Sequence, residues 1–97
     1  MTIIKRLLGA NIRHYRTNLG ISQAQLAEKA SMATNYLGLI ENGRKFPSAD
    51  MVERIAAALD VDSTNLFAID PVQQDWKKMI LSKIEHLINE ELEAPYR

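Results

Sequence analysis

The chain has 97 residues, with 12 basic and 12 acidic side chains and a formal net charge of zero. This length fits one domain with at most a short extension, because domains usually contain about 50–200 residues. It leaves little room for the deep cleft of an elaborate enzyme. The absence of cysteine excludes disulfides, thiol chemistry and cysteine-based zinc fingers, and it favours the cytoplasm.

Hydropathy gives no indication of a membrane protein. No stretch approaches the roughly 20 apolar residues that a membrane-spanning helix needs. Lys5 and Arg6 interrupt the apolar opening segment, which is therefore not typical of a secretory signal. With 46% hydrophobic residues and three prolines, the composition is typical of a soluble all-α protein.

The net charge of zero hides an uneven distribution along the chain. Residues 1–54 carry eight basic and four acidic side chains, a net charge of +4, whereas residues 55–97 carry four basic and eight acidic ones, a net charge of −4. A positive half is typical of proteins that bind an anion such as nucleic acid. The alternative is a chance division of solvated faces.

The spacing of apolar residues predicts five helices in the first two thirds of the chain. In the first helix, Leu8, Ile12, Tyr15 and Leu19 fall on one stripe, and Gly20 follows as a C-terminal cap. The expected helices span residues 4–19, 23–29, 33–41, 49–59 and part of 60–67.

Polar residues mark where the later helices begin. Ser22, with Gln25 three residues further on, predicts a capping box at the start of helix 23–29. Ser48 is expected to cap helix 49–59, and either Asp62 or Ser63 is expected to cap the short fifth helix. These caps make the helix starts the most specific feature of the local sequence.

Beyond the break at Asp70 and Pro71, residues 72–92 predict one long helix. Its apolar side chains cover an arc of about 220°, wider than the roughly 100° stripe that covers one core. We therefore expect this helix to contact two surfaces, the chain's own bundle and a second copy of the chain. The residues concerned are Trp76, Ile80, Leu81, Ile84, Leu87, Ile88 and Leu92.

Leu81, Ile88 and Leu92 are the residues assigned to the second copy, and the other four are assigned to the bundle. The alternative is that the whole helix packs on its own domain. A coiled coil with a strict two-position seam is less compatible with the broad apolar arc.

Two short helices joined by a tight turn are typical of a helix-turn-helix. The segments Leu19-Gly20-Ile21-Ser22-Gln23, Leu26-Ala27-Glu28-Lys29-Ala30 and Ile40-Glu41-Asn42-Gly43-Arg44-Lys45 follow one another at characteristic spacings. On these segments, residues 9–67 resemble the lambda-repressor-like Cro/C1 family of DNA-binding domains.

The resemblance implies an all-α fold, a five-helix DNA-binding domain over residues 1–70 with an additional C-terminal helix over 71–97 as a dimerisation arm. It also implies that the second helix crosses the DNA backbone and the third lies in the major groove. Gln23 would then bond a phosphate from the start of the second helix. Arg16 and Glu41 match the positions of a buried ion pair between the first and third helices.

Helical geometry predicts which side of helix 33–41 faces DNA. Ala33, Leu37 and Ile40 share one side and are expected to face the core, so the opposite side faces outward. Asn35 can pair with adenine, and Leu39 either touches a thymine methyl group or belongs to a surface for a protein partner. The residues expected in the groove are Thr34, Asn35, Gly38, Leu39 and Asn42.

Because the outward side of this helix is uncharged, affinity is expected to come from flanking Arg13, Arg44 and Lys45. Tyr36, on the flank of the helix, either donates its hydroxyl to a phosphate or packs its ring on the second helix. Phe46 is expected to fill the edge of the core.

Two residues of helix 33–41 depart from a regular pattern. Ala33 stands where the family usually has a capping Ser or Thr, and Ser31 is expected to act as a substitute cap. Gly38 costs about 1 kcal/mol relative to alanine inside a helix. A close approach of the backbone to another surface explains such a glycine, and drift at a tolerant site is the alternative.

These features predict a cytoplasmic, homodimeric transcriptional regulator, a repressor or controller protein that binds a pseudo-palindromic site on double-stranded DNA. Half-sites are expected about 34 Å apart, one helical turn of DNA. The alternative is an antitoxin or anti-regulator that uses Leu39 and the last helix to bind another protein. His14 and His86 stand alone in the sequence, so no metal is expected. No cofactor and no enzymatic activity are expected either.

Overall fold

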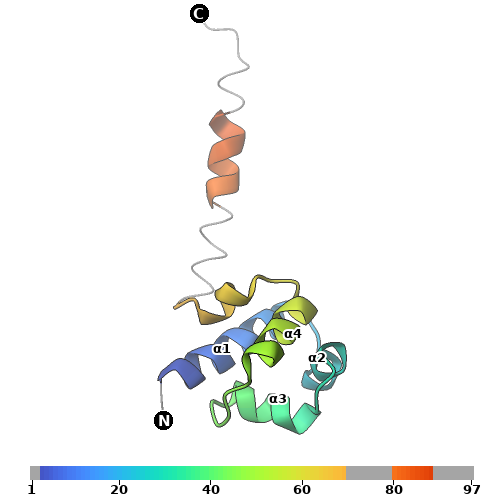
Figure 1. The fold of residues 1–97 in the computed structure, drawn as a ribbon. Coiled ribbons are helices and arrows are strands. Elements are labelled where there is room, and N and C mark those ends of the chain that lie inside the picture. The colour runs from blue at the N-terminus through green and yellow to red at the C-terminus, as the bar shows by residue number, and fades with distance from the viewer. Residues whose placement is uncertain (1–2, 70–79, 89–97) are drawn as a thin grey trace, which may run out of the picture.

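The structure, a computed structural model, describes residues 3–69 and 80–88 of the chain. The elements of residues 3–69 pack as one bundle, with α3 at the bottom and η1 at the top in Figure 1. They are α1 (Ile3–Asn18), α2 (Gln23–Ala30), α3 (Thr34–Glu41), α4 (Ala49–Leu59) and the short 3-10 helix η1 (Ser63–Phe67). The predicted all-α fold is confirmed, and each α-helix of the bundle begins and ends within one residue of its predicted bounds.

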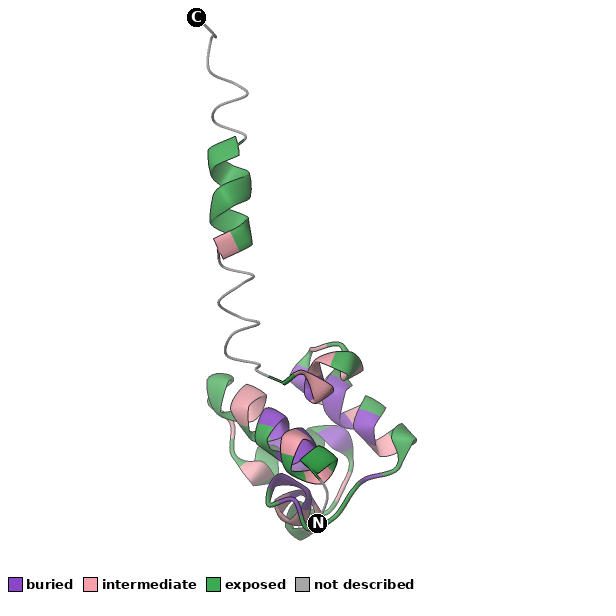
Figure 2. Ribbon diagram, turned by 90° about the vertical axis from the view of Figure 1, so that its left-hand side faces the viewer, coloured by how far each residue is buried: buried purple, intermediate pink, exposed green. Residues whose placement is uncertain are grey.

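The core lies where the helices of this bundle meet, and Figure 2 colours the buried residues on each of them purple. Its fully buried large apolar side chains are Leu8, Ile12, Leu26, Leu37, Ile40, Ile55 and Leu66. The prediction that Leu19 continues the apolar stripe of α1 is wrong. Leu19 is 51% exposed, because α1 ends at Asn18 and Leu19 lies in the turn.

The predicted N-terminal caps of α2, α4 and η1 are present. Ser22 Oγ accepts a hydrogen bond of 3.0 Å from the Gln25 amide, and Gln25 Oε1 accepts one of 2.8 Å from the Ser22 amide, which together form the capping box. Ser48 Oγ caps α4 by accepting from the Met51 amide at 3.1 Å. At η1 the cap is Asp62, whose pKa is lowered because its carboxylate accepts hydrogen bonds from the Thr64 amide and hydroxyl.

The start of α3 differs from the prediction. Ser31 does not cap α3, because it closes α2 in a left-handed conformation with φ of 58°. Ala33 is the N-terminal cap residue of α3 and makes no side-chain cap hydrogen bond. It is also exposed rather than turned to the core, since its extended backbone precedes the first helical turn.

Two polar side chains tie elements that are distant in the sequence. Asn11, buried in α1, donates from Nδ2 to the carbonyl oxygens of Leu66 and Ala68, both at 2.7 Å, and so holds η1 against α1. Arg54 of α4 donates from Nε to the Ala30 carbonyl at 3.1 Å and from Nη2 to the Ser31 carbonyl. The turn between α2 and α3 is therefore fastened to α4.

The backbones of α1 and α3 lie in direct contact at Gly9. A Cβ atom on Gly9 would lie 2.3 Å from the carbonyl oxygen of Ile40 and 2.7 Å from that of Glu41. These distances are far below van der Waals contact, so any larger residue would push the two helices apart. Gly9 thus sets the distance between α1 and the C-terminal end of α3.

Residues 80–88 are helical and stand apart from the bundle in Figure 1. Ile84 is 44% exposed and Leu87 is 59% exposed, so the prediction that they cover the bundle is wrong. Leu81 and Ile88, assigned to a second copy, are also exposed. Trp76 and Leu92 lie outside the described residues. Over residues 3–69 and 80–88, no helix is both long and apolar enough to cross a membrane.

The same substitution at two glycines should change stability in opposite directions. Gly9→Ala should destabilise the fold by about 1–3 kcal/mol, the usual cost of overpacking. Gly38→Ala should stabilise it by up to about 1 kcal/mol, because alanine is the better helix former and a Cβ there meets only the Gln23 side chain at 3.6 Å. Urea denaturation gives the free energy of unfolding of both variants. The same change in both would contradict the close contact at Gly9.

Candidate nucleic-acid interface

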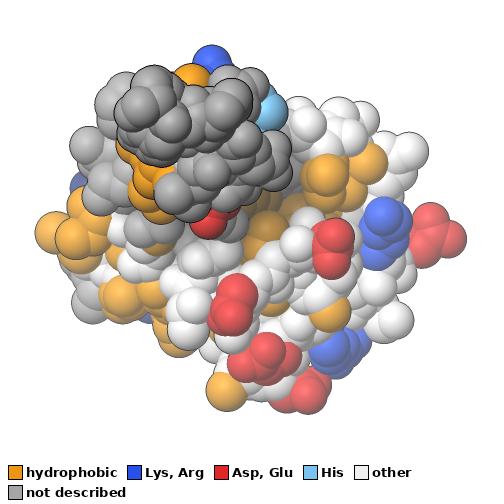
Figure 3. Space-filling view, turned by 90° about the horizontal axis from the view of Figure 1, so that it is seen from above, with side chains coloured by type: hydrophobic (Ala, Val, Ile, Leu, Met, Phe, Trp, Pro, Cys, Tyr) orange, Lys and Arg blue, Asp and Glu red, His pale blue; other side chains and the backbone are white. Residues whose placement is uncertain are grey.

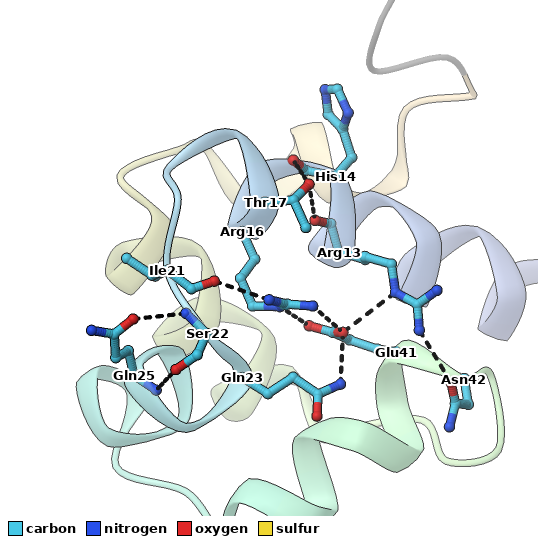
Figure 4. A network of polar contacts seen from close by, with 10 residues as sticks. All are labelled: Arg13, His14, Arg16, Thr17, Ile21, Ser22, Gln23, Gln25, Glu41 and Asn42. Atoms are coloured by element: carbon cyan, nitrogen blue, oxygen red, sulfur yellow. Dashed lines mark hydrogen bonds and ion pairs between the residues drawn. The ribbon is translucent and has the colours of Figure 1, made fainter.

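A single buried carboxylate joins α1 to α3. The Glu41 side chain is 0% exposed, and Arg16 donates to it from Nε to Oε2 at 2.7 Å and from Nη2 to Oε1 at 3.1 Å. The structure therefore brings together the two residues predicted to pair. Arg16 also donates from Nη1 to the Ile21 carbonyl at 2.9 Å, so one guanidinium holds α1, the turn before α2 and α3 (Figure 4).

The start of α2 is tied to the same carboxylate. Gln23, the first residue of α2, donates from Nε2 to Glu41 Oε1 at 2.9 Å. The family resemblance implied that this side chain bonds a DNA phosphate, and nothing in the spacing of Gln23 and Glu41 indicated their contact. The second Nε2 proton and the backbone amides at the helix terminus can still donate to a phosphate.

A looser contact lies at the edge of this network. Arg13 donates from Nη2 to Asn42 Oδ1 at 3.3 Å, and its Nε lies 3.6 Å from Glu41 Oε1. The Arg13 side chain is 54% exposed, so most of its donors face solvent. Two residues expected at DNA, one on α1 and one at the end of α3, are thus held side by side (Figure 4).

A hollow of about 420 Å³ opens between α1 and the C-terminal end of α3. Arg6 at its rim also packs against the loop after α3, since a Cβ on Gly43 would lie 3.3 Å from Arg6 Cγ. This contact depends on how α1 crosses α3, which the spacing of residues along the chain does not determine. The lining residues are Arg6, Ala10, Arg13, His14, Thr17, Glu41 and Asn42.

The outward side of α3 carries the residues that helical geometry placed there. Thr34 and Asn35 are exposed, and Gly38 and Leu39 are half-buried. Leu37 and Ile40, by contrast, are buried in the core. Tyr36 is half-buried and packs against the core cluster.

The loop after α3 presents the remaining basic residues. The backbone amides of Arg44 and Lys45 both donate to the Leu39 carbonyl, at 2.9 and 3.3 Å, and both side chains are exposed. The loop therefore holds two cations at the C-terminal end of α3. Phe46 fills the core edge only in part, because it is 43% exposed with its ring centroid 6.4 Å from that of Phe67.

The opposite side of the molecule differs in charge. Figure 3 views the face away from α3 and shows Asp and Glu side chains over it. Glu53, Asp60 and Asp62 are exposed acidic residues of α4 and of the segment leading to η1. Asp60 and Asp62 belong to the net-negative half of the sequence, residues 55–97, whereas Glu53 belongs to the net-positive half.

A short helix, a tight turn and a second helix with exposed polar residues at its start and cations at its C-terminal end are typical of a helix-turn-helix DNA-binding domain. A family model described as a helix-turn-helix domain matches residues 7–67. The chain therefore belongs to the helix-turn-helix family of DNA-binding transcriptional regulators, of the XRE or Cro/C1 type.

Three known proteins illustrate the likeness. The transcriptional regulator SinR of Bacillus licheniformis is 33% identical over 85 residues, which cover 87% of this chain and 76% of that protein. The restriction-modification controller protein C.AhdI from Aeromonas hydrophila is 32% identical, with a TM-score of 0.64 over 65% of this chain and 96% of the other. The biofilm regulator SinR in complex with DNA is 40% identical, with a TM-score of 0.59 over 63% and 98%.

Some curated relatives are much longer than the matched region. The aligned part of this chain spans only 50% of SinR from Bacillus subtilis. The likeness to that protein therefore concerns the helix-turn-helix region, and other properties of such relatives do not transfer with it.

The buried pair should show strong energetic coupling. Arg16→Met and Glu41→Leu should each destabilise the fold by about 3 kcal/mol, because each leaves one charge without its partner in a site that solvent barely reaches. The double variant should recover most of that loss, since apolar side chains often replace a buried ion pair without net cost. Urea denaturation of the three variants measures the coupling, and additive losses would contradict it.

Proposed function

We propose that this chain is a cytoplasmic, homodimeric repressor or controller protein that binds a pseudo-palindromic operator in double-stranded DNA, without enzymatic activity. The observation that carries the proposal is the Glu41 network. It fixes α2 and α3 relative to each other while the N-terminal end of α3 keeps Thr34 and Asn35 exposed. A recognition helix must be held in this way to read base edges.

In this proposal some residues around α3 contact bases and others contact phosphates. Thr34 and Asn35 enter the major groove, and the start of α2 at Gln23 meets the phosphate backbone through its amides. Arg44 and Lys45 bind phosphates beside the C-terminal end of α3, with Arg13 at the edge of the network. Phosphate contacts of this kind supply affinity, and base contacts supply specificity.

We further propose that residues 1–70 are the DNA-binding domain and residues 71–97 a dimerisation arm. In the described part of that arm, the apolar side chains share one stripe of about 120° at 100° per residue. A stripe of this width suits contact with one partner helix. Its residues are Ile80, Leu81, Ile84, Leu87 and Ile88, and four of the five are exposed.

The function is tested by selection from randomised duplex DNA. The proposal predicts enrichment of an inverted repeat whose half-sites are centred about one helical turn apart. Enrichment of a single half-site would support DNA recognition and contradict the dimer. If no sequence is enriched at about 50 mM salt, where phosphate contacts are strong, the regulator assignment fails.

The arm is tested by two neighbouring substitutions. Leu81→Asp should shift the full chain from dimer to monomer, because it places a charge on the apolar stripe of residues 80–88. Ser82→Asp, on the polar side of the same helix, adds the same charge and should leave the dimer intact. Light scattering after gel filtration gives the masses, and an unchanged mass for Leu81→Asp would rule out this arm as the interface.

A further inference from the structure

The outward side of α3 carries no Arg or Lys, the side chains that most often read guanine. Guanine is read in the major groove chiefly by Arg or Lys, which donate to O6 and N7, whereas Asn and Gln pair with adenine and apolar groups contact the thymine methyl. Within Thr34–Glu41 the only charged residue is Glu41, whose side chain is buried. The exposed polar groups at the entering end are Thr34 and Asn35.

The cations around α3 are either bound within the Glu41 network or lie toward the C-terminal end of the helix. Arg16 is bound to Glu41, and Arg13 donates to Asn42. Arg44 and Lys45 follow the C-terminal end of α3, about 12 Å along the axis from Thr34 for a helix of eight residues. Arg54, the cation at the turn before α3, donates to the Ala30 and Ser31 carbonyls.

Leu39 and Gly38 form an apolar surface next to Asn35, and this surface projects little from the helix because Gly38 has no side chain. Leu39 stands four residues after Asn35, so the two share one stripe of α3. Gly38 is not required by the packing of the bundle, since a Cβ there would make an ordinary contact with Gln23 Oε1 at 3.6 Å. Its missing side chain leaves room for a base edge to approach the helix backbone and the methyl groups of Leu39.

We propose that α3 reads A·T base pairs, with Asn35 paired to an adenine and Leu39 in contact with the methyl group of a thymine in the same half-site. The operator half-site is therefore A·T at the positions that α3 contacts, and its specificity is carried by one amide and one apolar contact. This inference rests on the proposed function and deepens it.

Deoxyuridine provides the test, because it removes only the thymine methyl group. In the operator recovered by selection, each thymine is replaced in turn and the dissociation constant is measured by fluorescence anisotropy at fixed salt. One replacement per half-site should weaken binding about fourfold, the equivalent of the roughly 0.8 kcal/mol gained by burying one methylene. The Leu39→Ala variant should bind the thymine operator and the deoxyuridine operator with the same dissociation constant.

Two further variants control the experiment. Arg44→Ala should weaken binding to both operators by the same factor and leave their ratio unchanged, because it removes a phosphate contact. Leu39→Met, which keeps a flexible apolar group in place, should retain sensitivity to the methyl group even if Leu39→Ala folds poorly. For the parent chain, replacing the adenine that pairs with Asn35 should weaken binding about tenfold or more. For Asn35→Ala the same replacement should have little effect.

The outcomes distinguish failure of A·T reading by α3 from failure of the proposed regulator function. An enriched operator with G·C pairs at the contacted positions overturns the inference and leaves the regulator intact. So does an A·T operator that no deoxyuridine replacement weakens, or one whose sensitivity survives in Leu39→Ala. A failed selection overturns both.

Discussion

The arrangement of this helix-turn-helix depends on one buried carboxylate. Glu41, at the end of α3, accepts hydrogen bonds from Arg16 of α1 and from Gln23 at the start of α2. Gly9 lets the α1 backbone lie against the end of α3, and Arg54 fastens the turn between α2 and α3 to α4. A charge in the interior contributes little net stability, so its value lies in the single orientation it enforces on the recognition helix.

That orientation explains why so few charges are needed at the interface. Because α2 and α3 are fixed before DNA arrives, little binding energy is spent on ordering them. In the proposed interface, the cations Arg13, Arg44 and Lys45 lie around the exposed side of α3 rather than on it. A chain with a net charge of zero can in this way present a side for DNA while Asp and Glu side chains lie on the face away from α3.

Features set by neighbouring residues could be predicted from the sequence, whereas features set by packing could not. The capping box depends only on Ser22 and Gln25, three residues apart, and the inward side of α3 depends only on the spacing of apolar residues within that helix. Leu19 and Ala33 were misplaced because helical periodicity was extended beyond the residues where the helices end. The contacts of Asn11 and Gln23 join residues distant in the chain. For Gly9, a glycine inside a predicted helix was the one available signal of a close backbone approach.

We infer that the Glu41 network serves orientation more than stability. The Arg16→Met, Glu41→Leu double variant tests this inference, through its affinity for the operator measured beside its stability to urea. We expect a variant nearly as stable as the parent that binds the operator at least about tenfold more weakly, a loss of roughly 1.4 kcal/mol. A double variant that is equally stable and binds with unchanged affinity would contradict it.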